Sequence, residues 1–153
     1  MRRLLSLFLV GILLCSTLVI AEETFTVSGE VKFSKRKGEI YVWLKTQEEF
    51  EKRREPASPA RSLMIKPSWQ ELKAKKVTFK FVDVPKGIYG IVCIQDLNKN
   101  GKMDYMEGAY IREIATEPFG YSGPRFLGAA QWDDAKFEVD KDISGIEIEM
   151  SGP

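Results

Sequence analysis

The sequence predicts an all-β fold, a Greek-key β-sandwich of about seven strands preceded by a signal peptide. From residue 24 onward, apolar and polar residues alternate over short segments, and clusters of turn-forming residues separate these segments. The first 21 residues have a different pattern, typical of an export signal. The predicted organisation is therefore a signal peptide over residues 1–21 and a single sandwich domain over residues 22–153. Within this domain, a longer irregular insertion is expected at about residues 47–76.

The N-terminal segment begins with Arg2 and Arg3, continues as a mostly apolar stretch over residues 4–20, and ends at Ala21. This order indicates a signal peptide that is cleaved before Glu22. One alternative is an uncleaved membrane anchor, although spans usually need about 20 apolar residues. Another is lipidation at Cys15, where Leu14 replaces the small residue that lipoprotein signals require. We expect an exported protein of the periplasm, the cell envelope or the extracellular medium, with no membrane span after cleavage.

The predicted strands follow in order along the mature chain. Residues 25–33 place phenylalanine and valine on one face, and Gly29 interrupts this face, which indicates a bulge or a close approach of another segment. Further strands are expected at residues 40–44 and 77–81. Residues 88–94 are apolar on both faces, which is typical of a central strand. Residues 137–139 and 146–150 give two closing strands, which residues 140–145 are expected to join as a hairpin.

The insertion breaks the alternating pattern. Residues 47–54 are highly charged and indicate a short helical turn that ends before Pro56 and Pro59. Residues 62–65 indicate a short edge strand. Ser68 stands three residues before Glu71, which is the spacing of a capping box at the start of a helix.

Composition limits the classes of function. The chain has no histidine, so most zinc sites and the Ser-His and Cys-His nucleophile pairs are excluded. The formal net charge of +1 gives no argument for nucleic acid or an anionic membrane surface as a partner. Loss of Cys15 with the signal leaves Cys93 without a disulfide partner, and its apolar neighbours indicate a buried small side chain.

The most informative segment is residues 96–107, which match the EF-hand loop pattern D-x-[DN]-x-[DN]-G-x5-E at every position. Calcium prefers six to eight oxygen ligands, and this spacing supplies them from a tight loop that turns at a glycine. Gly101 occupies that turning position. The predicted ligands are the side chains of Asp96, Asn98, Asn100, Asp104 and Glu107 and the backbone carbonyl of Lys102.

Two features of this loop bear on the prediction of a calcium site. Asn100 and Gly101 are also a strong hairpin signal, so a metal-free turn is the alternative interpretation. Lys99 and Lys102 partly offset the three carboxylates, which predicts weak calcium binding of about 10⁻⁴–10⁻³ M. The segment before the loop has a strand pattern, so we expect a calcium loop on a β-scaffold with a structural role.

The chain also resembles a known family. Residues 82–89 look like the proline-glycine-tyrosine turn of prealbumin-like and carboxypeptidase-regulatory-like β-sandwiches. Together with the loop at 96–104 and residues 120–122 and 134–137, they resemble the bacterial exported family "domain of unknown function 2141" over roughly residues 25–150. The resemblance implies this fold and export, and no established activity. This chain departs from the family pattern at Gln95, where members often have histidine, at Glu107, where they do not regularly have an acid, and in its longer segment 56–76.

Three functional hypotheses follow. The first is an exported noncatalytic module with a structural calcium ion that binds a protein, peptide or glycan, with no nucleic acid as a partner. The second is a small hydrolase that uses paired carboxylates, drawn from Glu107, Glu117, Asp133 and Asp134. The third is a metal-free structural or adhesion domain. We favour the first, and expect the aromatic-rich stretch 105–132, including a loop at 117–124, to cap the core beside the calcium loop.

Overall fold

The computed structural model describes residues 22–52, 55–107, 114–124 and 131–152. The predicted signal peptide lies outside these residues. The described chain is mostly β-structure, which confirms the all-β prediction, and its strands form two main sheets and a small two-stranded sheet. Two main sheets of this kind bury the apolar sides of alternating strands against each other.

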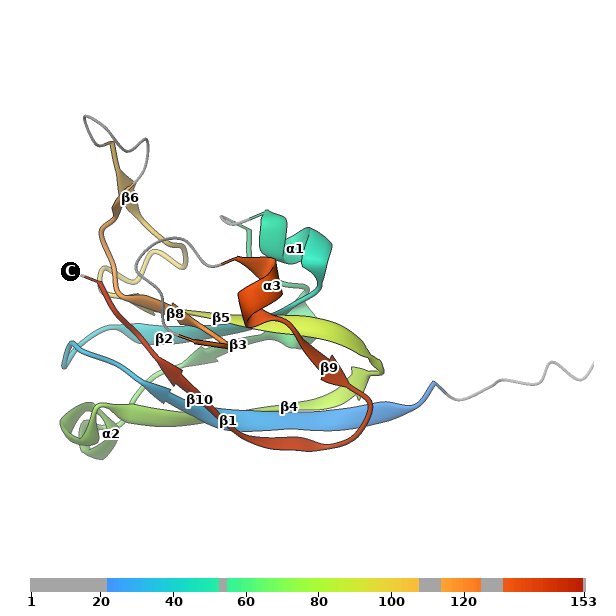
Figure 1. The fold of residues 1–153 in the computed structure, drawn as a ribbon. Helices are drawn as coiled ribbons and strands as arrows, with labels where there is room; N and C mark the ends of the chain where they lie inside the picture. Colours follow the sequence, from blue (N-terminus) through green and yellow to red (C-terminus); the bar gives the residue numbers. More distant parts are fainter. Residues whose placement is uncertain (1–21, 53–54, 108–113, 125–130, 153) are drawn as a thin grey trace, which may run out of the picture.

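The first sheet contains three strands, in the order β10 (Ile143–Glu149), β1 (Thr24–Lys32) and β4 (Lys76–Pro85). The second sheet has the order β3 (Ser62–Ile65), β2 (Glu39–Lys45), β5 (Gly87–Asp96) and β8 (Phe119–Tyr121), and β9 (Phe137–Val139) pairs with the first part of β5. The small sheet, β6 (Tyr105–Met106) and β7 (Ile114–Ala115), projects beyond the end of the sandwich (Figure 1).

The main hydrophobic core lies between the two large sheets. Val27 and Phe79 of the first sheet and Val42, Ile91 and Cys93 of the second belong to one buried cluster. Cys93 is fully buried, and this burial raises the pKa of its thiol far above the ordinary value. The small-hydrophobe interpretation of Cys93 is therefore confirmed.

The outer face of the second sheet is also covered, which explains why β5 is apolar on both faces. Helices α1 (Gln47–Glu51) and α3 (Trp132–Ala135) lie over this face (Figure 1). The ring centroids of Phe50 and Trp132 lie 5.5 Å apart, and both side chains cluster with Tyr121. The central position predicted for residues 88–94 is confirmed, since β5 pairs with β2 on one side and with β8 and β9 on the other.

The predicted bulge at Gly29 is present. The register of β1 shifts between Val27 and Gly29 where it pairs with β10. A β-carbon at Gly29 would lie 2.1 Å from the carbonyl oxygen of Ile146 and 2.8 Å from the ring of Phe79. Glycine is therefore required here because two neighbouring strands approach the backbone closely.

The closing strands do not form the predicted hairpin. β9 pairs antiparallel with β5 in the second sheet, whereas β10 pairs parallel with β1 in the first. Residues 140–142 therefore cross from one sheet to the other. The turn residues of this segment looked like a hairpin, but the apolar faces of the two strands are buried from opposite sides of the same core.

The insertion contains the short elements that its sequence indicates. These are α1, the 3-10 helix η1 (Pro59–Arg61), the edge strand β3 and α2 (Trp69–Ala74). Ser68 and Glu71 form the predicted capping box, and Thr46 and Glu49 form another at α1. The Glu49 carboxylate also accepts hydrogen bonds from both terminal nitrogens of Arg61, at 2.7 and 3.0 Å. This pair joins α1 to η1 within the insertion.

Lys45 is a fully buried lysine beside this insertion. Its Nζ donates to the carbonyl oxygens of Glu49, at 3.2 Å, and Glu55, at 2.5 Å, and lies 5.3 Å from the ring centre of Trp43. Burial lowers the pKa of Lys45 from 10.5 to about 8, although the charges of Glu49 and Glu55 oppose this effect.

We expect Lys45 to contribute a rise of about 2 kcal/mol to the free energy of unfolding between pH 8 and pH 10. Cys93 opposes this rise, because the unfolded chain releases its thiol proton in the same range while the buried thiol keeps it. The folded protein releases the Lys45 proton near pH 8, whereas the unfolded chain keeps it until about pH 10.5, so the unfolded state binds more protons in this window. Above pH 10 the trend should reverse, because burial raises the pKa of Tyr41 and Tyr89 above 10.0. Urea unfolding over this pH range measures the Lys45 contribution as the difference between the unchanged protein and Lys45→Met, because Cys93 contributes equally to both. The same pH profile in both proteins would show that Lys45 contributes nothing.

Candidate functional site

The loop at residues 96–107 begins where the central strand β5 ends and leads into β6. Asp96 is the last residue of β5 and is fully buried. Gly101 has a φ of +78°, the left-handed conformation that lets the chain turn back. The strand therefore holds the first predicted ligand rigidly, and the glycine returns the chain toward it.

Asp96 organises the first half of the loop through its carboxylate. Oδ1 accepts hydrogen bonds from the backbone N–H groups of Lys99, at 2.5 Å, and Asn100, at 3.2 Å. Oδ2 accepts from the N–H of Gly101 at 2.7 Å. Because the side chain is buried and faces three backbone donors, Asp96 holds the first half of the loop in its turned conformation.

The other predicted side-chain ligands converge on Asp104. Its Oδ2 accepts from Nδ2 of Asn98 at 2.6 Å and from Nδ2 of Asn100 at 2.8 Å. The amide oxygens accept backbone N–H groups instead, Asn98 from Asn100 and Asn100 from Lys102. Four of the predicted ligands thus lie together in one hydrogen-bonded network: Asp96, Asn98, Asn100 and Asp104.

The remaining two predicted ligands are placed differently. Lys102 lies on the exposed part of the loop between Gly101 and Met103. Glu107 follows β6, is exposed, and forms no hydrogen bond or ion pair with the residues that the structure describes. Its spacing matches the twelfth position of the motif, but the strand pairing of β6 with β7 directs the chain away from the loop (Figure 1).

Glu117 belongs to the segment that was expected beside the loop, but the sequence did not predict that its carboxylate contacts the loop. Only 3% of its surface is exposed. Oε1 accepts from the backbone N–H of Leu97 at 2.7 Å, and Oε2 accepts from that of Asp104 at 3.4 Å. Glu117 therefore joins both ends of the loop to the segment before β8, a contact that no spacing rule could indicate.

Gln95 connects the loop to the turn at residues 34–38. Its side chain is fully buried, donates to the carbonyl oxygens of Lys35 and Lys37, and accepts from the N–H of Lys35. Burial, with smaller contributions from the charges of Glu39 and Asp96, raises the pKa of the adjacent Tyr41. The buried amide of Gln95 therefore makes the loop part of a rigid end of the sandwich.

The donor chemistry of this loop suits a hard cation. The side chains that converge in it offer carboxylate and amide oxygens, which is the ligand type that calcium prefers. In the described part of the chain, no group of three or more histidine, cysteine, aspartate and glutamate side chains is arranged to hold a metal. A cation would therefore need the amide oxygens of Asn98 and Asn100 to turn toward Asp104, replacing the two N–H contacts.

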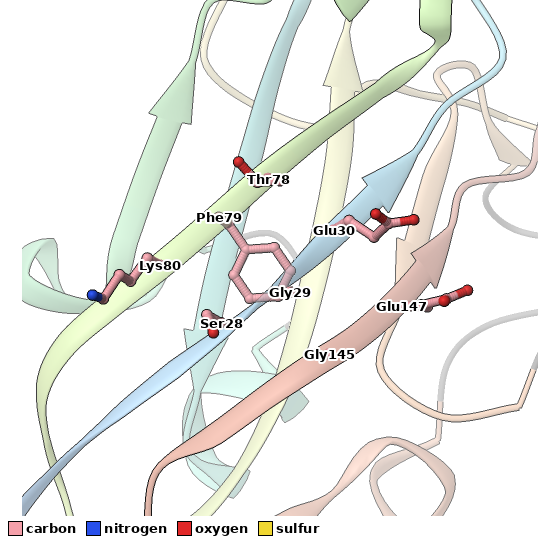
Figure 2. A pocket seen from close by; sticks show the side chains of 8 residues that line it. All are labelled: Ser28, Gly29, Glu30, Thr78, Phe79, Lys80, Gly145 and Glu147. Atoms are coloured by element: carbon pink, nitrogen blue, oxygen red, sulfur yellow. The ribbon is translucent and has the colours of Figure 1, made fainter.

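A hollow lies elsewhere, on the three-stranded sheet. Its volume is about 520 Å³, and Figure 2 shows the residues that line it, which come from β1, β4 and β10 and include Gly29, Phe79 and Gly145. A smaller hollow of about 220 Å³ lies beside β8 and β10. The carboxylates considered for hydrolysis, Glu107, Glu117, Asp133 and Asp134, line neither of these two hollows.

The aromatic-rich stretch is only partly described, since Tyr110 and Phe126 lie outside the described residues. Tyr121 and Trp132 pack with Phe50 over the second sheet, as expected for aromatic side chains that cap a core. The loop predicted at 117–124 is wrong in part, because Phe119–Tyr121 form β8 and pair with β5. The glycine and proline residues of this segment favour a loop, but Phe119–Tyr121 form a short strand because they pair with the edge of β5. None of the described helices is both long and apolar enough to cross a membrane.

These features define a class of protein, a small all-β module with a carboxylate- and amide-rich loop at one end of its central strand. A bacterial family described as "Uncharacterized protein conserved in bacteria (DUF2141)" matches residues 25–146, and the chain belongs to this family. No curated protein and no solved structure matches the chain.

Proposed function

We propose that this protein is an exported noncatalytic module whose loop at residues 96–107 binds a structural calcium ion, with a binding or envelope-associated role. The observation that carries this proposal is the convergence of Asp96, Asn98, Asn100 and Asp104 in one network at the motif spacing. A partner would be a protein, peptide or glycan that contacts this end of the sandwich.

A calcium ion bound in this loop would stabilise the folded protein. The loop joins β5 to β6, and Glu117 joins the loop to the segment before β8. A cation held by the oxygens of Asp96, Asn98, Asn100 and Asp104 would link these segments and offset the charge of the two carboxylates. Glu117 lies beside the loop and would be a further ligand, whereas Glu107, which matches the motif spacing, would have to turn back from its exposed position after β6.

We expect calcium to raise the melting temperature of the protein that begins at Glu22. Ligand that binds only the folded state stabilises it by about 1.4 kcal/mol when its concentration is about tenfold above Kd. For a domain of this size the expected shift is about 3–5 °C. The measurement is a thermal melt in chelator and then in millimolar calcium, with magnesium as the control ion.

Asp104→Asn tests the site better than a change at Asp96, because Asp96 also holds the loop without metal. The calcium shift should be largely lost in Asp104→Asn and unchanged in the exposed control Asp140→Asn. Glu107→Gln then decides whether that carboxylate is a ligand. Equal shifts in the first two variants, or no shift at tens of millimolar calcium, would contradict the proposal.

One observation favours a metal-free structural domain as the second candidate. The amide groups of Asn98 and Asn100 already satisfy Oδ2 of Asp104, and backbone N–H groups satisfy Asp96. A loop whose carboxylates already have these hydrogen-bond partners forms a stable turn without a metal ion. Under this hypothesis the melting temperature is the same in chelator and in calcium.

A further inference from the structure

Trp69 is the most exposed large apolar side chain of the described residues. It lies on helix α2 with 70% of its surface accessible, whereas Trp43 in the core is 2% accessible. The Nζ of Lys73 lies 5.4 Å from its ring centre. An amphipathic ring exposed beside lysine is typical of side chains that rest at the boundary of a lipid bilayer.

Basic residues from two segments of the chain lie at the same end of the domain as this tryptophan. The N–H of Phe33 donates to the carbonyl of Lys75 at 3.0 Å, and Lys32 pairs with Lys76 between β1 and β4. The turn after β1 therefore lies beside the end of α2 (Figure 1). We call this surface the α2 end; besides Trp69 it carries Lys35, Arg36, Lys37, Lys66, Lys73, Lys75 and Lys76.

Most of this positive charge is not neutralised. Lys66 lies 3.7 Å from a carboxylate oxygen of Glu39, and Lys76 lies 2.9 Å from one of Glu30. The Glu71 carboxylate lies on α2 and accepts the N–H of Ser68. The other basic side chains form no ion pair with any carboxylate that the structure describes: Lys35, Arg36, Lys37, Lys73 and Lys75. The overall charge of +1 therefore conceals a strongly basic end.

We propose that the α2 end docks onto the surface of an anionic phospholipid bilayer. The unpaired cations contact the lipid phosphates, and the ring of Trp69 enters the boundary between headgroups and acyl chains. A soluble polyanion would use the cations but offers no apolar layer for the ring. The start of β1 lies at the opposite end of the domain from the α2 end (Figure 1). The proposal does not depend on calcium binding.

The test is cosedimentation of the protein that begins at Glu22, which contains every described element, with lipid vesicles in chelator. The protein should bind vesicles made of equal parts phosphatidylcholine and phosphatidylglycerol, remain free with phosphatidylcholine alone, and dissociate at high salt. Arg36→Glu/Lys73→Glu should weaken the partition coefficient about tenfold or more. Trp69→Ala should weaken it several-fold, and the blue shift of tryptophan fluorescence on binding should disappear in Trp69→Phe.

Matched controls lie at the opposite end of the domain. Lys86 and Lys141 are exposed there, next to the pairing of Gly87 with Val139, and Ile88 is 56% exposed. Lys86→Glu/Lys141→Glu and Ile88→Ala should bind vesicles as the unchanged protein does. All the substituted side chains are exposed, so thermal melts should confirm folding.

Three results would overturn the proposal: no binding to anionic vesicles, equal weakening in the control variants, or binding that is unaffected by Trp69→Ala and is matched by heparin. The last result would assign the α2 end to a soluble polyanion.

Discussion

Replacing Gly29 by alanine is expected to lower the free energy of unfolding by about 3 kcal/mol, the result of forcing a methyl group into a closed space. The new β-carbon would lie 2.1 Å from the backbone oxygen of Ile146 and 2.8 Å from the ring of Phe79. The first atom belongs to the backbone of the parallel strand β10, so relief requires the strand itself to move. In a thermal melt this corresponds to a fall of roughly 10 °C.

Gly145 provides the matched control on the neighbouring strand β10. Its φ is +77°, and a β-carbon there would meet no atom within 4 Å. Gly145→Ala should therefore cost only about 1 kcal/mol, through its backbone conformation. If the two variants melt at the same temperature, the close approach at Gly29 does not limit stability.

Replacing Asp96 by alanine is expected to cost about 3 kcal/mol in the complete absence of calcium. The change leaves the N–H groups of Lys99, Asn100 and Gly101 without the carboxylate that they share. Hydrogen bonds to a charged group contribute about 1.5–3 kcal/mol, and the groups that lose them keep their desolvation cost. Urea unfolding in chelator measures the loss, and hydrogen exchange should show a loss of protection at the Gly101 amide.

Asp96→Asn separates geometry from charge at this position. The amide keeps one acceptor oxygen in a side chain of the same shape, so about half of the stability loss is expected. If Asp96→Ala were as stable as the unchanged protein, the buried carboxylate would not organise the loop, and its three hydrogen bonds would contribute nothing to stability.

Several features followed from the sequence because they depend on neighbouring residues. Alternation located β1, β2 and β4, and a stretch that is apolar on both faces located β5 and placed it in the centre of its sheet. The interrupted apolar face at Gly29 predicted the bulge. The spacing of the loop predicted that Asp96, Asn98, Asn100 and Asp104 would converge. The glycine and the alternating polar positions encode that turn locally.

Other features were wrong or missing because they depend on segments that are distant in the sequence. The turn at residues 140–142 has hairpin composition, yet β9 and β10 join different sheets. The sequence predicts a loop at the position of β8 because glycine and proline surround this short strand. The strand forms because the edge of β5 provides a pairing partner. Glu117 reaches the loop through the same pairing, because β8 brings its segment beside the end of β5.

The sequence by itself determined the all-β class, the order of the main strands and the composition of the loop, because period and spacing are properties of contiguous residues. The tertiary structure alone decided which strands share a sheet, which carboxylate contacts the loop and which basic residues share an end of the domain with Trp69. Those arrangements arise when the two sheets bury their apolar faces against each other. Which segments meet depends on the shape of the whole core, and the pattern of neighbouring residues does not encode that shape.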